Sequence, residues 1–150
     1  MEGIAMITLG LGILTLANAM LYVVAAILHW GVRIAVGPIV LAFPDTIPAA
    51  TAVESVIALC LTAGAIAVLG RFGRAMPIIW AAYGLALVGT LFGLTIALIR
   101  GLEGPDIWVH FLMLAGLAGG FALLLIGRQT SRARPMRPNS QQPEVRDGRD

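Results

Sequence analysis

The sequence predicts an all-α integral membrane protein, a bundle of four transmembrane helices followed by a disordered polar tail. Hydrophobic residues make up 59% of the 150 residues and charged residues only 12%, and the apolar residues gather in four long stretches. A soluble domain has about 25% charged residues. Such a domain could not bury this much apolar surface, whereas a bilayer can accommodate it.

Each apolar stretch is long enough to cross the hydrocarbon core of a membrane, which takes about 20 helical residues. In lipid, only helices and closed barrels satisfy their own backbone hydrogen bonds, and these stretches lack the strict alternation of barrel strands. Glu2 precedes the first stretch and no basic residue does, so we expect a retained helix and not a cleaved signal peptide. The expected helices cover residues of about 4–28, 50–69, 77–99 and 107–126.

The connections between these helices differ in length. Short polar breaks at residues 71–74 and 100–106 make the neighbouring helices antiparallel. The first connection, residues 30–49, contains Gly37-Pro38 between two apolar segments that are too short to span a membrane. It predicts either a short hairpin or an interfacial helix at the membrane surface.

Arginine placement predicts the orientation. Residues 1–128 form the predicted transmembrane domain, and residues 129–150 form a basic, proline-containing tail whose composition predicts disorder. Six of the ten arginines lie at or beyond Arg128. Arg71 and Arg74, in the link between the second and third spans, lie on the same side of the membrane as these six, because two spans separate that link from the tail. Because arginine marks the cytoplasmic side, we expect a multi-pass protein of the cytoplasmic membrane with both termini inside. The net charge of +2 belongs to the tail and does not indicate nucleic-acid binding.

Five ionisable side chains share one predicted level near the outer end of the bundle: His29, Glu54, Arg100, Asp106 and His110. Each has an explanation that needs no function. Thr51 and Glu54 have the spacing of a capping box. Asp106 and His29 suit the electrostatics of helix ends, and Asp106 can pair with His110 on one helix face.

The functional interpretation of this set is a pocket open to the outside, formed by His29, Glu54 and His110. Two imidazoles and a carboxylate are a possible metal set, with Asp106 orienting one imidazole. They suit equally a proton-linked substrate site or a quinone headgroup site, because histidine titrates near neutral pH. Haem between the two histidines is a further alternative. The spacing matches no metal motif, so no metal site and no cofactor is predicted, while quinone, metal and haem stay open.

Small and polar residues inside the expected spans indicate helix packing. Gly89 and Gly93, like Gly116 and Gly120, are four residues apart and let helix backbones approach closely. Asn18, near the middle of the first span, is expected to bridge helices by hydrogen bonds. These glycine faces predict packing within the bundle, with a homo-oligomer as the alternative.

Short motifs in the first half of the chain resemble those of DoxX-like small membrane proteins. The motifs are AILHW at 26–30, FPDTIP at 43–48, Val53-Glu54-Ser55, Gly64 and Gly70-Arg71, within about residues 25–75. The resemblance implies a four-helix membrane fold and a membrane-associated redox or accessory role. It places His29 and Glu54 on positions of the family pattern.

Three functional hypotheses follow. The leading one is non-enzymatic: an accessory, scaffold or interaction subunit in the lipid bilayer, in a larger membrane complex or a homo-oligomer. The second is a DoxX-like quinone- or thiol-linked redox component that uses the outer pocket. The third is a small oligomeric transporter or channel. The sequence contains no P-loop, GxSxG, HExxH or CxxC motif, and its single cysteine, Cys60, lies inside an apolar stretch.

Overall fold

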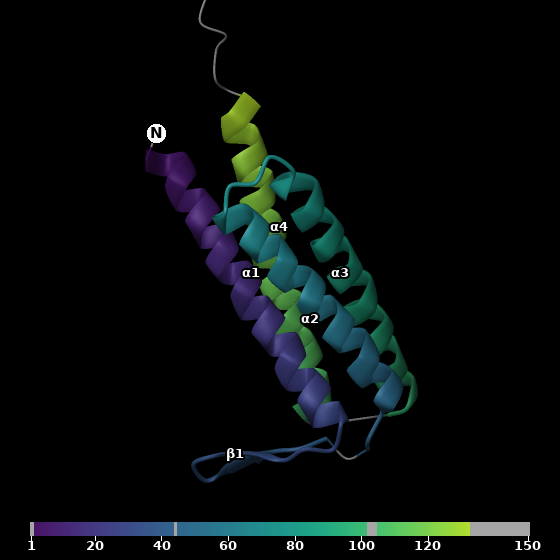
Figure 1. The fold of residues 1–150 in the computed structure, drawn as a ribbon. Helices are drawn as coiled ribbons and strands as arrows, with labels where there is room; N and C mark the ends of the chain where they lie inside the picture. The colour runs from purple at the N-terminus through teal and green to yellow at the C-terminus, as the bar shows by residue number, and fades with distance from the viewer. Residues whose placement is uncertain (1, 44, 102–104, 133–150) are drawn as a thin grey trace, which may run out of the picture.

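The computed structural model describes residues 2–43, 45–101 and 105–132. In this part of the chain four α-helices run up and down beside one another (Figure 1): α1 (Glu2–His29), α2 (Pro48–Leu69), α3 (Ala75–Ile99) and α4 (Pro105–Arg132). The link from α1 to α2 contains two short strands, β1 (Ile34–Val36) and β2 (Ile39–Leu41). All four helices are long and apolar enough to span a membrane, as the sequence predicts.

The helices form a four-cornered bundle. α1 packs against α2 and α4, and α3 packs against the same two helices, so α1 and α3 lie on a diagonal. Figure 1 shows the N-terminus, the α2–α3 link and the end of α4 at one end of the bundle, with the hairpin at the other. The described termini of the bundle therefore lie on the same side.

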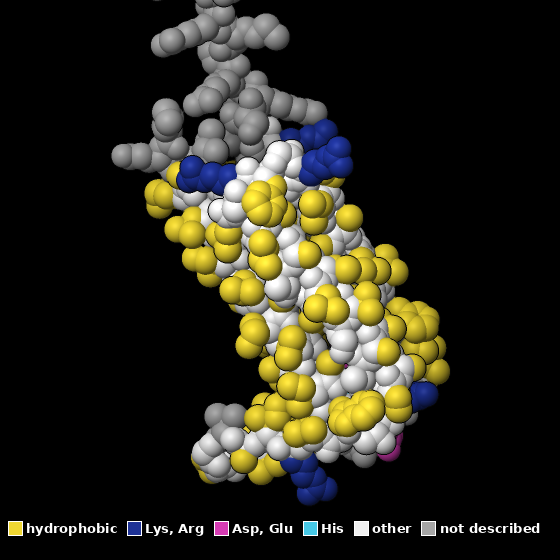
Figure 2. All heavy atoms as spheres, viewed as in Figure 1, with side chains coloured by type: hydrophobic (Ala, Val, Ile, Leu, Met, Phe, Trp, Pro, Cys, Tyr) yellow, Lys and Arg dark blue, Asp and Glu magenta, His cyan; other side chains and the backbone are white. Residues whose placement is uncertain are grey.

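The surface and the interior have the polarity of a protein surrounded by lipid. Large apolar side chains such as Leu59, Val88 and Phe92 are exposed on the sides of the helices, and Figure 2 shows arginines only toward the ends. Among the residues that the structure describes, six polar side chains are buried in the interior: Thr15, Asn18, His29, Glu54, Thr90 and His110. In lipid there is no hydrophobic driving force for burying apolar side chains between helices. The helices are therefore held together by close packing and by interhelical hydrogen bonds.

The start of α2 corrects one sequence prediction. The capping box expected at Thr51 and Glu54 is wrong, because Ile47 is the N-cap and Pro48 occupies the first turn, where its fixed φ suits a helix. The Thr51 hydroxyl instead lies 3.3 Å from the carbonyl oxygen of Ala26 and 3.4 Å from that of Ile47. Glu54 is therefore inside the helix, where its side chain is not needed as a cap.

The structure also decides between two predicted alternatives for a loop and extends one predicted helix. Of the two alternatives for residues 30–49, the structure has the hairpin, with Ile34 paired to Leu41 and Gly37 in the turn at φ +60°. α4 continues to Arg132, so residues 129–132, expected in the tail, are helical. The disorder predicted for residues 133–150 lies outside the described residues.

Candidate functional site

His29 and Glu54 form a buried pair between α1 and α2. The Nδ1 atom of His29 lies 2.8 Å from Oε2 of Glu54, and the two residues are only 4% and 7% exposed. An ionised carboxylate only accepts hydrogen bonds, so with Glu54 in that form the imidazole donates its Nδ1–H to it. Nε2 is the second nitrogen of the ring and takes no part in this contact.

The chain that follows the hairpin covers this pair. The ring of Phe43 is buried and tilted against the imidazole of His29, with centroids 4.5 Å apart at 56°. The backbone N–H of Ile47 donates to the carbonyl oxygen of His29 at 2.9 Å. These contacts hold the last turn of α1 against the start of α2 and fix the orientation of the imidazole.

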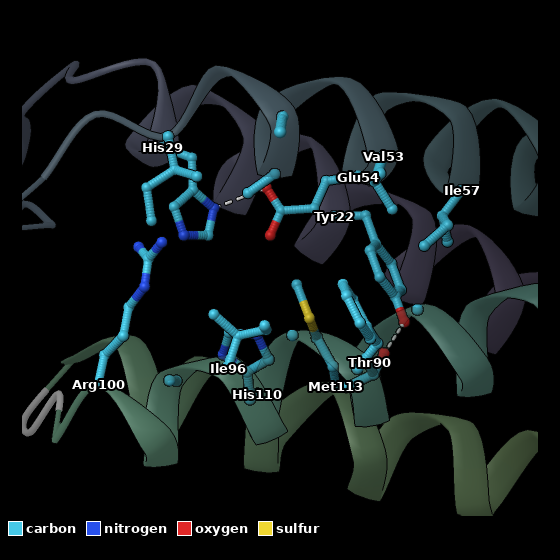
Figure 3. A pocket seen from close by; sticks show the side chains of 17 residues that line it. Tyr22, His29, Val53, Glu54, Ile57, Thr90, Ile96, Arg100, His110 and Met113 are labelled. Atoms are coloured by element: carbon cyan, nitrogen blue, oxygen red, sulfur yellow. Dashed lines mark hydrogen bonds and ion pairs between the residues drawn. The ribbon is translucent and has the colours of Figure 1, made fainter.

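A cavity of about 260 Å³ lies beside the pair, and residues from all four helices line it. In Figure 3, His29 and Glu54 reach into it from one side, and His110 and Met113 reach into it from the other. Most of the remaining wall is apolar: Ile47, Val53, Ile57, Phe92, Ile96 and Ala97. The ionisable groups thus share a largely hydrophobic cavity.

The cavity opens toward the lipid-facing side of the bundle. Val53 of α2 and Phe92 of α3 both line it and are 51% and 67% exposed. Because α2 and α3 are neighbours in the bundle, the opening lies between these two helices. The cavity beside the pair is therefore open at the apolar surface of the bundle between these two helices.

Two of the predicted glycines shape the cavity. A Cβ atom on Gly93 would lie 2.7 Å from Nε2 of His110, and a Cβ atom on Gly89 would lie 2.5 Å from Cδ1 of Ile57. Both distances are too short for real side chains. The glycines therefore bring α3 close to α2 and α4 and leave space for the His110 imidazole, which is itself buried.

Tyr22 lines the inner end of the cavity. Its hydroxyl donates to the carbonyl oxygen of Ala86 at 3.1 Å and makes a second, short contact with the hydroxyl of Thr90. This group connects α1 to α3 across the diagonal of the bundle. The sequence analysis did not include Tyr22 in the site, although it lies two helical turns before His29 on the same face of α1.

A second polar cluster lies deeper in the bundle. The hydroxyl of Tyr83 is 3.1 Å from that of Thr15 and accepts a hydrogen bond from Nδ2 of Asn18 at 3.4 Å. Asn18 packs directly on Gly116, and the Tyr83 ring packs directly on Gly120. The structure thus places the predicted packing residues inside the bundle, between α1, α3 and α4.

Four of the five ionisable residues that the sequence places near the outer end of the bundle meet at one cavity. His29, Glu54, Arg100 and His110 all line the cavity, with Arg100 exposed at the end of α3. Asp106 lies in the first turn of α4, but its side chain is outside the described residues. In the part of the chain that the structure describes, no group of three His, Cys, Asp or Glu side chains is placed to hold a metal ion.

No family model matches the chain, and no curated protein or solved structure matches it. The resemblance to DoxX-like proteins therefore stays a prediction.

Proposed function

We propose that the protein is a quinone-binding subunit of the cytoplasmic membrane, which holds the headgroup of a quinol or quinone in the cavity beside His29 and Glu54. One observation carries the proposal: a buried His–Glu pair and a second histidine share a largely apolar cavity that opens sideways between α2 and α3. Few other ligand classes need both features.

The shape of a quinone suits this cavity. Its ring carries oxygens on opposite edges, and His29 and His110 reach into the cavity from opposite sides (Figure 3). Its isoprenoid tail is apolar and would leave past Val53 and Phe92 into the bilayer. The cavity measures about 260 Å³, just below the range of about 300–1,000 Å³ that is usual for pockets that enclose a whole ligand. The ring would lie inside it and the tail outside.

The His29–Glu54 pair supplies proton chemistry. In this proposal a quinol hydroxyl donates a hydrogen bond to Nε2 of His29, and this nitrogen can take up the hydroxyl proton as a general base, which leaves a negative charge on the quinol oxygen. The Glu54 carboxylate, already bonded to Nδ1, stabilises the imidazolium that forms. Because the pair is buried, this stabilisation is stronger than it would be in water.

The orientation is part of the proposal. Arg71, Arg74 and Arg128 lie at the end of the bundle that carries the N-terminus, and arginine marks the cytoplasmic side. With both termini inside, the cavity lies in the outer half of the membrane. The accessory role expected from the sequence is compatible with this site, because a subunit can bind a ligand and a partner on different surfaces.

Titration with a short-tailed quinone tests the proposal. We expect decylubiquinone to quench the tryptophan fluorescence of the protein in lipid nanodiscs in a saturable way. His110→Leu should weaken binding by about ten-fold, as the loss of one buried hydrogen bond implies. Thr15→Val is the matched control, since Thr15 is buried and polar but does not line the cavity.

Both variants must keep the circular dichroism spectrum of the unmodified protein. Equal affinity of the His110→Leu and unmodified proteins would overturn the proposal, and so would a linear, unsaturable quenching curve for the unmodified protein.

A further inference from the structure

A second cavity, of about 430 Å³, lies on the outside of the bundle between α1 and α2. Its floor is made of small buried residues, Ala26 and Ala58, and its sides are made of the exposed residues Val23, Ile27 and Leu59. This groove shares no lining residue with the cavity beside His29. A ligand in this groove would therefore be separate from one in the cavity beside His29.

The hairpin closes one end of the groove. Trp30 and Val32, where the chain leaves α1 for the hairpin, line the groove. Figure 1 shows the hairpin projecting sideways from the end of the bundle, and Figure 2 shows a hollow between the hairpin and the helices. The outer backbone groups of a two-stranded hairpin need polar partners, so the hairpin belongs at the membrane interface and not in the hydrocarbon.

The length of the groove matches one leaflet. On α2 it extends from Thr51 to Thr62, a rise of about 16 Å at roughly 1.5 Å per residue. Half of the hydrocarbon core is about 15 Å thick. A groove of this length that ends at an interfacial hairpin fits an acyl chain, whereas a partner helix crossing the whole membrane would need a groove that follows α2 over its full length, from Pro48 to Leu69.

The end of the groove at the hairpin has the groups that a lipid headgroup region prefers. Trp30 is exposed there, and indole rings favour the level of the glycerol esters. Arg33 does not line the groove, but it is exposed and follows directly on Val32, so it adds a positive charge at the level of the hairpin, where a phosphate would lie.

We infer that this groove is a binding site for one phospholipid, with an acyl chain between α1 and α2, the glycerol region at Trp30 and the phosphate near Arg33. This inference does not depend on the quinone site. It predicts a retained lipid that exchanges more slowly than the other lipids around the bundle.

Native mass spectrometry with dioleoyl phosphatidylglycerol as the probe tests the inference. We expect one lipid to bind the detergent-purified protein before any others. Ser55→Phe and Ile27→Trp fill the groove from opposite sides, and each should weaken this first binding by about ten-fold, the effect of removing roughly two methylene groups from apolar contact. Arg33→Gln should weaken it about three-fold through loss of the phosphate contact.

Ala63→Phe is the matched control, because Ala63 is exposed on the same helix but does not line the groove. It should bind the lipid like the unmodified protein. Unchanged lipid binding in both groove variants would overturn the inference, and so would a statistical series of adducts with no preferred first lipid. Quinone titration of the same variants separates the two sites, because their quinone affinity should not change.

Discussion

Removal of either member of the His29–Glu54 pair should destabilise the protein by different amounts. The two residues are 4% and 7% exposed and 2.8 Å apart. His29→Ala leaves a buried carboxylate without its partner, which costs about 3–5 kcal/mol of unfolding free energy. Glu54→Ala leaves an imidazole that can stay neutral, so its cost is the smaller one of an unmet hydrogen bond, about 1–3 kcal/mol.

The double variant should cost less than the sum of the two single variants. With both side chains removed, no buried charge is left without a partner, and the remaining cost is lost packing, including the contact of His29 with Phe43. We expect a coupling energy of about 2 kcal/mol between the two positions.

Unfolding in mixed micelles, followed by circular dichroism as a denaturing detergent is added, measures these free energies. A second cycle that combines His29→Ala with Thr62→Val serves as the control, because Thr62 bonds only within its own helix and lies outside the cavity beside His29. Those two effects should add within about 0.5 kcal/mol. If the effects of His29→Ala and Glu54→Ala on the unfolding free energy also add as closely as this, the idea that the two groups act as one buried pair is refuted.

Two further predictions concern packing and orientation. Gly120→Ala places a Cβ atom against the Tyr83 ring and should lower the unfolding free energy by about 1–3 kcal/mol in the same assay. Gly84→Ala, where the added Cβ atom would meet nothing within 4 Å, should be neutral or stabilising. Equal effects of the two substitutions would contradict the packing account. In a Cys60→Ser background, Ile39→Cys, at a hairpin residue that is 61% exposed, should react with an impermeant maleimide on intact cells, and Gly73→Cys only after lysis. The reverse pattern would invert the orientation.

The four spans could be predicted from the sequence because the bilayer imposes a simple requirement. Each span needs about 20 apolar residues and its own backbone hydrogen bonds, and the residues of α1 to α4 meet both conditions. The hairpin could not be distinguished from an interfacial helix, because its two apolar segments are too short to show a period. Only the pairing of Ile34 with Leu41 decides it.

Part of the site could be predicted from the sequence. The outer-level ionisable residues stood out because polar side chains are rare in spans, but Glu54 had a second explanation as a cap, which fails once Pro48 begins the helix. Tyr22 and Phe43 were missed as site residues, since an aromatic residue in an apolar segment usually indicates packing. Their role depends on which helices are neighbours, and the spacing within one helix does not contain that information.

The measurement that tests the quinone site most directly is extraction of the protein purified gently from its own membranes, with quantification of the bound isoprenoid quinone. Val53→Trp narrows the opening of the cavity, and Val56→Trp, at a residue of the same helix that is 52% exposed and outside the cavity lining, is the control. We expect near-stoichiometric quinone in the unmodified and Val56→Trp proteins and little in Val53→Trp. Folded, unmodified protein that carries no quinone, or equal amounts in all three proteins, would contradict the account.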